Sequence, residues 1–479
     1  MVAFRDVNFG SASAKTEREI APHLLLEGYY DLDGHLRRLL EGPQFLVLGY
    51  KGSGKSSVGE RLLLLQDVQR DLYVRQMDLE EFPFGSLDRI IGGTVDVETK
   101  YPIAWSWLTL ITLLDSFLDD DRRVSTSDHD IKRVIGNLRQ VGLLPAKRTR
   151  DLAQVRLKGS VRASFPALLD ASVELDSQTH GPDPWIQVAS QLKQLVLGLR
   201  TPNRHLLVID GLDAVLTRSD VQLSSLSALL NELVRLNAEF ARAGTPAKVL
   251  LLCRADLFDR LPNPNKNTIR RDKAVFLDWY QAAPNSDRPH LLELIERRAA
   301  LAGYAGSEFL AEHLPPGINR RDPQAYLLDH TRHTPRDLIA ALNDIKTFAG
   351  TGRLTQEQVE RGLQCYAADY FFNEIHDELT GLLDDDERIK ALQLLGSLRQ
   401  RQFSMGLLRR KARGNNSWAE LDIDRLVHAL FECSAIGNVQ RRTSGGSRLA
   451  FKYRNWNTSL DVDDLIILHR ALWKALNHP

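Results

Sequence analysis

The sequence is poor in the residues on which small secreted and metal-binding proteins depend. Its 479 residues include only three cysteines, Cys253, Cys365 and Cys433, which lie far apart. This spacing excludes a disulfide framework and a zinc site and favours a reducing compartment. No apolar run approaches the roughly 18 residues that a membrane span needs, and residues 1–20 contain no apolar stretch of signal-peptide length. The sequence therefore predicts a soluble, cytoplasmic protein with no membrane partner.

The chain also lacks an excess of charge of either sign. Its 62 basic and 62 acidic residues cancel, so no global field favours nucleic acid or a membrane, and any such affinity must come from a local patch. The length is typical of two to four domains, and the composition is that of a globular protein.

One segment, Phe45–Ser57, carries a strong signal for phosphate binding. Gly49 is followed after four residues by Gly54, Lys55 and Ser56, which is the spacing of a phosphate-binding loop between a buried strand and a helix. Backbone N–H groups of such a loop surround a phosphate, the lysine reaches the β- and γ-phosphates, and the serine hydroxyl is a Mg²⁺ ligand. We therefore predict ATP and Mg²⁺ as cofactors. The predicted nucleotide-binding residues are Gly49, Tyr50, Lys51, Gly52, Ser53, Gly54, Lys55, Ser56 and Ser57.

A second motif supplies a carboxylate for the metal. The apolar run at 206–209 leads directly into Asp210, which is the Walker B pattern of an acid at the end of a buried strand. We predict that Asp210 holds Mg²⁺ together with Ser56, and that Asp213 orients or deprotonates the attacking water. The structural alternative for both acids is a role in capping the loop.

The order of strands and helices predicts the fold class. Strands are expected near residues 45, 72, 205, 248 and 274, with helices between them and a helical insertion at 80–200. This alternation predicts a parallel α/β sheet. Because another strand separates the two motifs in sequence, it favours the NTPase branch that inserts a strand between them. Trp105 and Trp107, within the insertion, are expected to be core or interface anchors.

Three arginines near the fourth and fifth strands are candidates for sensing phosphate. Arg254 follows a strand expected beside that of the phosphate-binding loop, where it would sense the γ-phosphate or form a salt bridge at the rim. Arg270 and Arg271 are expected on a loop, either as arginine fingers that reach a neighbouring subunit or as ordinary surface residues.

From Pro289 the pattern becomes helical. At 334–337, Thr334 is expected to cap a helix and Pro335 to occupy its first position. Arg336 would place a cation at the positive end of that helix, which is unfavourable unless an anion compensates it. A bound phosphate or a neighbouring acid such as Asp337 would supply that anion.

The last part of the chain reads as three helices followed by a two-stranded hairpin, the arrangement of a winged helix. Residues 386–454 contain 14 Lys and Arg against 6 Asp and Glu. A basic hairpin beside a helix suits DNA phosphates, whereas winged helices also serve as packing and protein-docking modules. The candidate DNA contacts are Arg441, Arg442, Arg448 and Lys452, with Arg454 expected on the same hairpin.

The motifs YKGSGKSS, VIDGLD, CRADLFDRL and TPRDLI, in this order, resemble those of the AAA+/STAND region of P-loop ATPases. The resemblance is nearest to bacterial ATPases with a GxKGSGKS loop, and the layout of lid and winged helix is similar to that of origin-recognition ATPases. It implies an ATPase in which Lys55 and Ser56 bind nucleotide and Mg²⁺, Asp210 holds the metal, Arg254 is sensor 1 and Arg336 is sensor 2. One departure is Gly211, because AAA+ enzymes usually carry a glutamate there, and this favours slow hydrolysis.

The resemblance further implies an oligomeric regulator or remodeller that acts on DNA, in bacterial defence or mobile-element biology. The alternative is a STAND-type nucleotide switch that recruits a separate effector protein without binding DNA; a helicase loader is a third, weaker hypothesis. The expected domains are an N-terminal arm or short helix (1–20), a P-loop ATPase domain (21–285) with its insertion (80–200), a helical lid (286–354), a connector helix (355–385), and a winged-helix domain with a C-terminal helix (386–479).

Overall fold

The computed structural model describes residues 2–80, 97–125, six positions between 132 and 144, 184–212, 220–280, 288–441 and 446–478. The chain divides into two compact units, each described by itself. The sheet unit comprises Gly34–Gly49 and Lys55–Phe276. The helical unit comprises Met1–Asp33, Tyr50–Gly54 and Leu277–Pro479.

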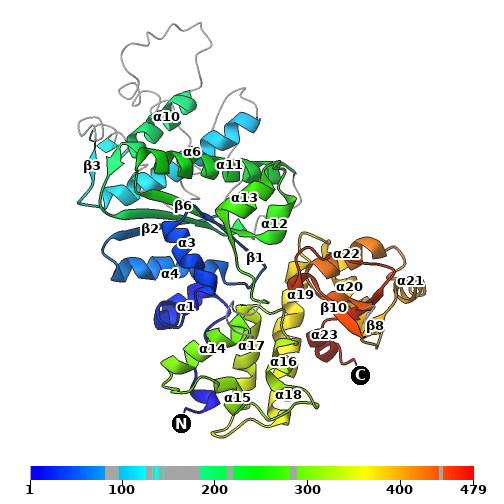
Figure 1. The fold of residues 1–479 in the computed structure, drawn as a ribbon. Helices are drawn as coiled ribbons and strands as arrows, with labels where there is room; N and C mark the ends of the chain where they lie inside the picture. The colour runs from blue at the N-terminus through cyan, green and yellow to red at the C-terminus, as the bar shows by residue number, and fades with distance from the viewer. Residues whose placement is uncertain are drawn as a thin grey trace. The chain divides into compact units, whose positions relative to one another are not determined.

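The sheet unit is built on a five-stranded parallel sheet. Its strands lie in the order β2-β5-β6-β1-β7 (Figure 1). Their bounds are β1 Leu46–Gly49, β2 Leu72–Asp78, β5 Arg204–Asp210, β6 Ala247–Arg254 and β7 Ala274–Phe276. All five expected strands are confirmed. Strand β6 lies between the strand of the phosphate-binding loop and the strand of Asp210, as the NTPase branch with an inserted strand requires. The predicted fold class, a parallel P-loop sheet with an AAA+-like strand order, is confirmed.

Helices cover both faces of this sheet, because β1 and the core of β5 are apolar on both sides. Figure 1 shows α6, α10 and α11 over one face and α3 and α4 over the other. The helices of this unit are α3 His35–Glu41, α4 Lys55–Val68, α6 Val97–Leu118, α10 Pro184–Leu197, α11 Asp220–Ala243, α12 Ala255–Arg260 and α13 Lys266–Lys273. A short antiparallel pair, β3 Val124–Ser125 and β4 Leu199–Arg200, lies apart from the main sheet.

The described part of the insertion is mainly helical, as expected, but it also contains the short strands β3 and β4, which the sequence did not predict. Trp105 and Trp107 on α6 are fully buried, and the Trp105 indole N–H donates to the Ser225 carbonyl of α11 at 3.0 Å. Both tryptophans are therefore core anchors. The basic stretch at 147–162 lies outside the described residues.

The expectation of a loop carrying Arg270 and Arg271 was wrong. Both residues lie on α13, where Arg270 pairs with Asp259 and packs over the Phe258 ring. A helix forms here because no glycine or proline interrupts residues 266–273, whereas the preceding Asn-Pro-Asn suggested a longer loop.

The helical unit contains the N-terminal segment, the lid and the C-terminal module. Its helices are η1 Phe4–Asp6, α1 Ala14–Ile20, α2 Pro22–Leu26, α14 His290–Leu301, α15 Phe309–His313, α16 Pro323–Leu328, α17 Pro335–Lys346, α18 Gln356–Cys365, the π-helix η5 Tyr366–Phe371, α19 Phe372–Glu378, α20 Asp385–Ser397, α21 Met405–Arg413, α22 Ile423–Glu432, η6 Lys452–Arg454 and α23 Arg470–Ala475; the short turn η2, Leu32–Gly34, runs into the sheet unit. Because α18, η5 and α19 follow one another without a break, the expected connector is helical along 356–378.

The N-terminal segment contains the short helix α1 and packs into the helical unit, so the mobile-arm alternative was wrong. Phe4 and Phe9 are fully buried against Phe309 of α15. Glu17 forms a buried ion pair with Arg298 of α14 at 2.6 Å. Burial of these rings explains why a segment of polar composition is ordered.

The C-terminal module has the expected helices α20, α21 and α22 and the expected hairpin. The hairpin strands are β9 Ile436–Arg441 and β10 Ser447–Ala450. Two further strands, β8 Gln402–Phe403 and β11 Leu465–Leu468, complete an antiparallel sheet of order β10-β9-β11-β8. The sequence predicted Lys452 and Arg454 on the hairpin, and this was wrong. Both residues lie on η6, beyond the hairpin. The chain leaves the hairpin here because the side chains of Phe451 and Tyr453 point inward and pack with Ile467 in a buried cluster.

Within the part of the chain that the structure describes, no helix is both long and apolar enough to cross a membrane.

Candidate nucleotide-binding site

The carboxyl edge of the parallel sheet gathers the residues that sequence reasoning selected. In the pairing of β1 with β6, Gly49 lies opposite Arg254, and each ends its strand. Asp210 ends β5, on the other side of β6. Carboxyl edges are where open α/β sheets bind their ligands. The register therefore brings one acid and one arginine to the edge from which the phosphate-binding loop leaves.

Lys55 opens α4, with Ser56 and Ser57 in the same first turn. The lysine side chain is buried, and its Nζ donates to the Gly49 carbonyl at 3.3 Å. The ammonium is therefore held at the end of β1 and over the start of the helix. This is the position from which a lysine reaches a phosphate at a helix N-terminus.

The residue after Asp210 is fixed as glycine by its surroundings. Gly211 has φ +83°, and a Cβ there would lie 2.6 Å from the Glu80 nitrogen and would collide with the Asp78 carboxylate. Its N–H donates to Asp210 Oδ1 at 2.8 Å, which orients the carboxylate. A glutamate at this position would have no room. The departure from the usual Asp-Glu pair is thus a consequence of the local packing.

Sequence reasoning missed Asp78, which brings a second carboxylate to this edge. It ends β2 and lies opposite Asp210 in the strand register. Its Oδ1 accepts the Glu80 N–H at 2.9 Å. The available signal was an aspartate at the end of a predicted strand, as at Asp210, although the residues before Asp78 alternate between apolar and polar instead of forming a continuous apolar run.

Arg254 is held by an acid two residues further along the chain. Its Nε donates to Asp256 Oδ1 at 2.9 Å and its Nη2 to Oδ2 at 2.7 Å. Burial opposes the ionisation of Asp256, but the charge of Arg254 and its hydrogen bonds, together with the charge of Lys55, hold the pKa of Asp256 below its usual range. The rim salt bridge is therefore present, and it fixes the direction of a guanidinium beside Gly49. A sensor role for Arg254 stays a prediction.

The loop residues Tyr50–Gly54 belong to the helical unit, where they contact the start of α17. Gly52 has φ +79°, and a Cβ there would lie 3.1 Å from Thr334 Oγ1 and 3.2 Å from Arg336 Cβ. The Arg336 N–H donates to the Gly52 carbonyl at 3.3 Å. Trp279 supports the same loop, since its indole N–H donates to the Ser53 carbonyl at 2.8 Å. The loop and the helix that bears the predicted sensor 2 are therefore in direct contact.

The start of α17 is built as its sequence indicates. The Thr334 hydroxyl accepts the Asp337 N–H at 3.2 Å, and Pro335 occupies the first position. The interpretation that pairs Arg336 with Asp337 was wrong: Asp337 pairs instead with Arg332, at 2.9 Å. Burial opposes both charges, yet the mutual attraction raises the pKa of Arg332 and lowers that of Asp337.

Arg336 pairs instead with another acid, Glu374 of α19, at 4.0 Å, so the alternative of a neighbouring acid holds for a different residue, and 31% of the Arg336 side chain stays exposed. Two more loop residues reach other parts of the helical unit. Lys51 pairs with the same Glu374 at 3.0 Å, and the Tyr50 hydroxyl donates to the Lys452 carbonyl at 3.1 Å. The loop is thus tied to the connector and to the C-terminal module.

The basic residues of the C-terminal module are unevenly distributed. Arg448 is exposed on β10, whereas the Lys452 ammonium pairs with Glu432 at 3.1 Å. Arg441 ends β9, and its side chain, like the whole of Arg442, lies outside the described residues. Helix α21 carries exposed cations that sequence reasoning did not select: Arg409, Arg410, Lys411 and Arg413. The signal for them was present in the run RRKAR.

Asp213, the predicted base, also lies outside the described residues. The remaining residues fit a magnesium nucleotide. The Ser56 hydroxyl and the Asp210 carboxylate are the oxygen ligands that Mg²⁺ prefers, and a magnesium ion takes one or two protein oxygens beside phosphates and water. The loop is curled, with the Ser53 N–H donating to the Tyr50 carbonyl at 3.2 Å. Lys55 and the first turn of α4 supply the positive charge.

One segment of the chain matches a family model. A family model described as the FunZ-associated C-terminal helical domain matches residues 289–373. The matched segment runs from the residue before α14 into α19 and includes Thr334 and Arg336. No curated protein matches the chain.

Among solved structures, the chain is similar to the Orc1 protein of Aeropyrum pernix in complex with DNA, at 15% identity and a TM-score of 0.41, over 96% of this chain and 96% of that chain. It is also similar to Cdc6p from Pyrobaculum aerophilum, at 14% identity and a TM-score of 0.30, over 93% of this chain and 92% of that chain.

Proposed function

We propose that this chain binds ATP with Mg²⁺, hydrolyses it slowly, and uses the nucleotide state to regulate a C-terminal module that contacts DNA. The observation that carries the proposal is the register at the carboxyl edge of the sheet. Gly49 and Arg254 are paired neighbours there, Asp210 ends the next strand, and Lys55 opens the helix that follows the loop. A P-loop sheet uses this edge for a nucleoside triphosphate.

Each residue has a defined role in this proposal. Lys55 and the N–H groups of the loop bind the β- and γ-phosphates, while Ser56 and Asp210 hold Mg²⁺, which neutralises phosphate charge when bound. Arg254 and Arg336 sense the γ-phosphate as sensors 1 and 2. Asp213 accepts a proton from the attacking water. Because Gly211 leaves no adjacent glutamate, water activation is weak and we expect slow turnover.

The experiment is calorimetric titration of the full chain with ATP and Mg²⁺. We expect one site per chain for the native protein and at least a tenfold loss of affinity for Lys55→Ala, because the lysine makes a charge-assisted contact with phosphate. Lys266→Ala, which removes a lysine from α13 on the same unit, is the control and should bind normally. A native protein without ATP affinity, or an unaffected Lys55→Ala variant, would refute the proposal.

DNA contact is the second part of the proposal, and the exposed cations of α21 support it together with Arg448 on β10. Helix α22, which follows α21, exposes Asp424, Arg425, His428 and Glu432. Of these, Arg425 pairs with Glu387 at 3.2 Å. This surface offers little net positive charge for reading bases. The arrangement favours contacts with the phosphate backbone and weak sequence preference.

Fluorescence anisotropy with a labelled duplex, with and without ATP and Mg²⁺, tests this second part. Affinity that changes with nucleotide and falls steeply with salt supports a regulator that acts on DNA. Absence of DNA affinity at physiological salt, with nucleotide-dependent assembly retained, would support the alternative of a switch that recruits an effector protein. The setting in bacterial defence or mobile-element biology is supported only by the resemblance of the loop motif.

Assembly into a homo-oligomer completes the proposal. Of the two arginines considered as fingers, Arg270 is engaged with Asp259, whereas Arg271 is exposed on α13. Arg271 is therefore the better candidate to reach the nucleotide of a neighbouring copy. Light scattering with ATP should show assembly, and Arg271→Ala should lower ATP turnover without lowering ATP affinity. Turnover that is unchanged in this variant would remove the finger.

A further inference from the structure

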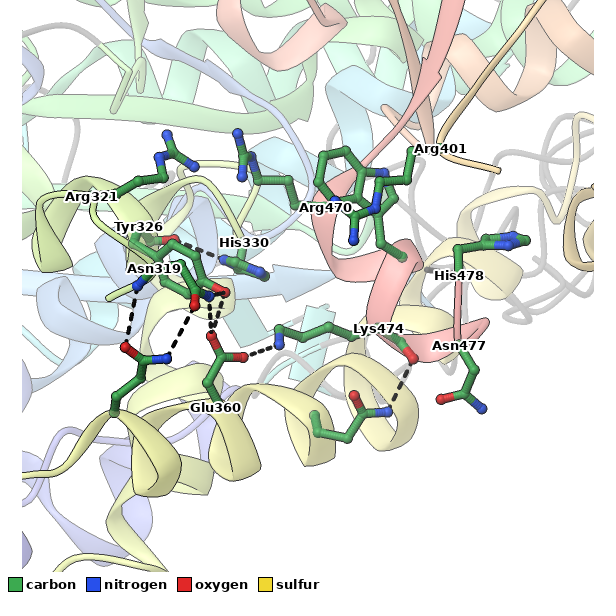
Figure 2. A pocket seen from close by; sticks show the side chains of 13 residues that line it. Asn319, Arg321, Tyr326, His330, Glu360, Arg401, Arg470, Lys474, Asn477 and His478 are labelled. Carbon is green, nitrogen blue, oxygen red and sulfur yellow. Dashed lines mark hydrogen bonds and ion pairs between the residues drawn. The ribbon is translucent and has the colours of Figure 1, made fainter. Parts of the chain in front are cut away.

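A cavity lies within the helical unit, and no residue of the phosphate-binding loop lines it. It has a volume of about 710 Å³ and is lined by side chains from α16, α18 and α23 and from the segments beside them (Figure 2). Cavities of 300–1,000 Å³ accept small organic ligands. This one is large enough for a nucleotide.

The lining of this cavity carries an excess of positive charge. Arg321, Arg401, Arg470 and Lys474 face Glu360 as the lining carboxylate. Behind the lining, Asp329 accepts ion pairs from Arg321 at 2.6 Å and from Arg470 at 3.4 Å, as well as from Arg454 at 3.3 Å. Two carboxylates thus pair with four of these five cations.

The other cations of the lining are already held in place. Lys474 pairs with Glu360, which also accepts the Tyr326 hydroxyl at 2.6 Å, as Figure 2 shows. Among the described residues, Arg401 has no carboxylate partner, and its guanidinium lies 4.5 Å from the centroid of the Trp473 ring. Arg401 is therefore the cation most available to an incoming anion.

Trp473 organises two of the guanidinium groups. Arg470 lies 5.1 Å from the centroid of the same ring, and the indole N–H donates to the Leu468 carbonyl at 2.8 Å, which fixes the ring. Two guanidinium groups positioned by one aromatic ring are preorganised, and the planar fork of arginine matches the oxygens of a phosphate. Trp473, Arg401 and Arg470 thus form the part of the lining that is best suited to bind an anion.

The protonation states agree with an unsatisfied positive site. Burial lowers the pKa of Arg470; the charge of Asp329 opposes this shift, and the neighbouring Arg321 and Arg454 add to it. Burial also lowers the pKa of His330 to about 4, with Lys474 and Arg470 adding to the effect, so this histidine is neutral at pH 7. An anion in the cavity would relieve the repulsion among these cations.

We propose that this cavity binds a small phosphate ester of nucleotide size, with Arg401 and Arg470 as the phosphate ligands. The site is separate from the phosphate-binding loop and is lined by residues of the lid, the connector and the C-terminal segment. The Gln364 side chain of α18 also links the connector to α23, by donating to the Lys474 carbonyl at 3.0 Å. A ligand that engages both arginines therefore ties α23 to the segment that leads into β8.

The test uses the full chain carrying Lys55→Ala, in which phosphate binding at the loop is suppressed. Calorimetric titration with sodium pyrophosphate, and separately with ADP, is expected to show one site per chain. Arg401→Gln should weaken binding roughly tenfold, because one charge-assisted contact is lost, and the double variant with Arg470→Gln should weaken it further. The matched control is Arg409→Gln, which removes an exposed arginine paired with Asp424 on α21.

The two probes distinguish the sources of phosphate. Tighter binding of ADP than of pyrophosphate assigns a nucleotide, and equal binding assigns phosphate recognition alone; both support the site. No binding of either probe at millimolar concentration would overturn the proposal, as would binding that Arg401→Gln leaves unchanged. Arg401 forms no ion pair with any residue that the structure describes, so this variant should keep the native melting temperature and decides the outcome even if the double variant unfolds.

Discussion

Gly211 and the carboxylate of Asp78 occupy adjoining space at the tips of β5 and β2, so no side chain fits at position 211. This relationship links a departure in the sequence to a property of the site. The acid that usually follows the metal-binding aspartate is missing because the next strand has placed a carboxylate where its Cβ would lie. In the hydrolysis proposed above, another group of the chain would have to activate the water.

The first prediction concerns stability at Gly211. Gly211→Ala should lower the free energy of unfolding by several kcal/mol, because the left-handed backbone alone costs about 1–2 kcal/mol and the methyl group also collides with Asp78. Gly244→Ala is the matched control, since Gly244 has φ +69° and open space around it. Gly244→Ala should therefore lower the free energy of unfolding only by the cost of the left-handed backbone. Equal losses in denaturant titrations would show that the close approach to Asp78 has no energetic weight.

The second prediction concerns Arg336. Because this arginine contacts Gly52 of the loop and keeps part of its guanidinium exposed, Arg336→Ala should weaken ATP binding about tenfold and ADP binding much less. Titration calorimetry with both nucleotides measures the difference. Arg361→Ala, which removes an exposed arginine from α18, should change neither affinity. A parallel loss for ATP and ADP would argue against contact with the γ-phosphate.

The third prediction concerns the cations of α21. Replacing Arg410, Lys411 and Arg413 by glutamine should weaken DNA binding and reduce the slope of log K against log salt by about 2 to 3, as expected for the loss of three phosphate contacts. The charge-matched control replaces Arg37, Arg38 and Arg361, which are exposed on α3 and α18. An equal loss in the control would mean that net charge, rather than α21, determines the affinity.

The fourth prediction concerns pH. Burial lowers the pKa of His333 to about 4, and the charge of Arg454 lowers it further, while Asp329 and Asp337 oppose the shift. Its ring stacks on Tyr453 and meets the edge of Tyr280. Between pH 6.5 and 4 the unfolded chain binds a proton that the native chain does not. The free energy of unfolding therefore decreases as the pH is lowered, by up to about 1.4 kcal/mol per pH unit.

The matched variant for this test is His333→Asn. His333 has φ +52°, a conformation that asparagine tolerates better than most residues. Over the same pH range, its free energy of unfolding should fall by about 3 kcal/mol less than that of the native chain. Parallel pH profiles for the two proteins would show that the pKa of His333 is the same in the native and the unfolded chain, and would contradict the prediction.

Much of the fold could be predicted from sequence because its strands are buried on both faces. The apolar runs before Gly49, Asp210 and Arg254 identify three neighbouring strands, and the order of the motifs predicts the inserted strand between the first two. The place of Arg254 beside the phosphate-binding loop was expected for the same reason and is confirmed by the pairing of Gly49 with Arg254.

The errors arose where long-range contacts override local composition. Nothing local indicates that Phe4 and Phe9 pack against Phe309, or that Asp337 takes Arg332 rather than Arg336 as its partner. Likewise, the run after β10 looks like a continuing basic strand, but Phe451 and Tyr453 turn inward and place Lys452 and Arg454 on a short helix. The cavity between lid and C-terminal segment was invisible in the sequence, because its arginines are separated by up to 149 positions, from Arg321 to Arg470.

The hydrogen bond from Tyr50 to the Lys452 carbonyl and the ion pair from Lys51 to Glu374 have a mechanical meaning. Both begin at residues inside the glycine-rich turn, so that turn cannot change its shape without either breaking these links or pulling the connector and the C-terminal module with it. A change in the shape of the turn would therefore act directly on Glu374 and on Lys452, some four hundred residues further along the chain, without passing through the parallel sheet.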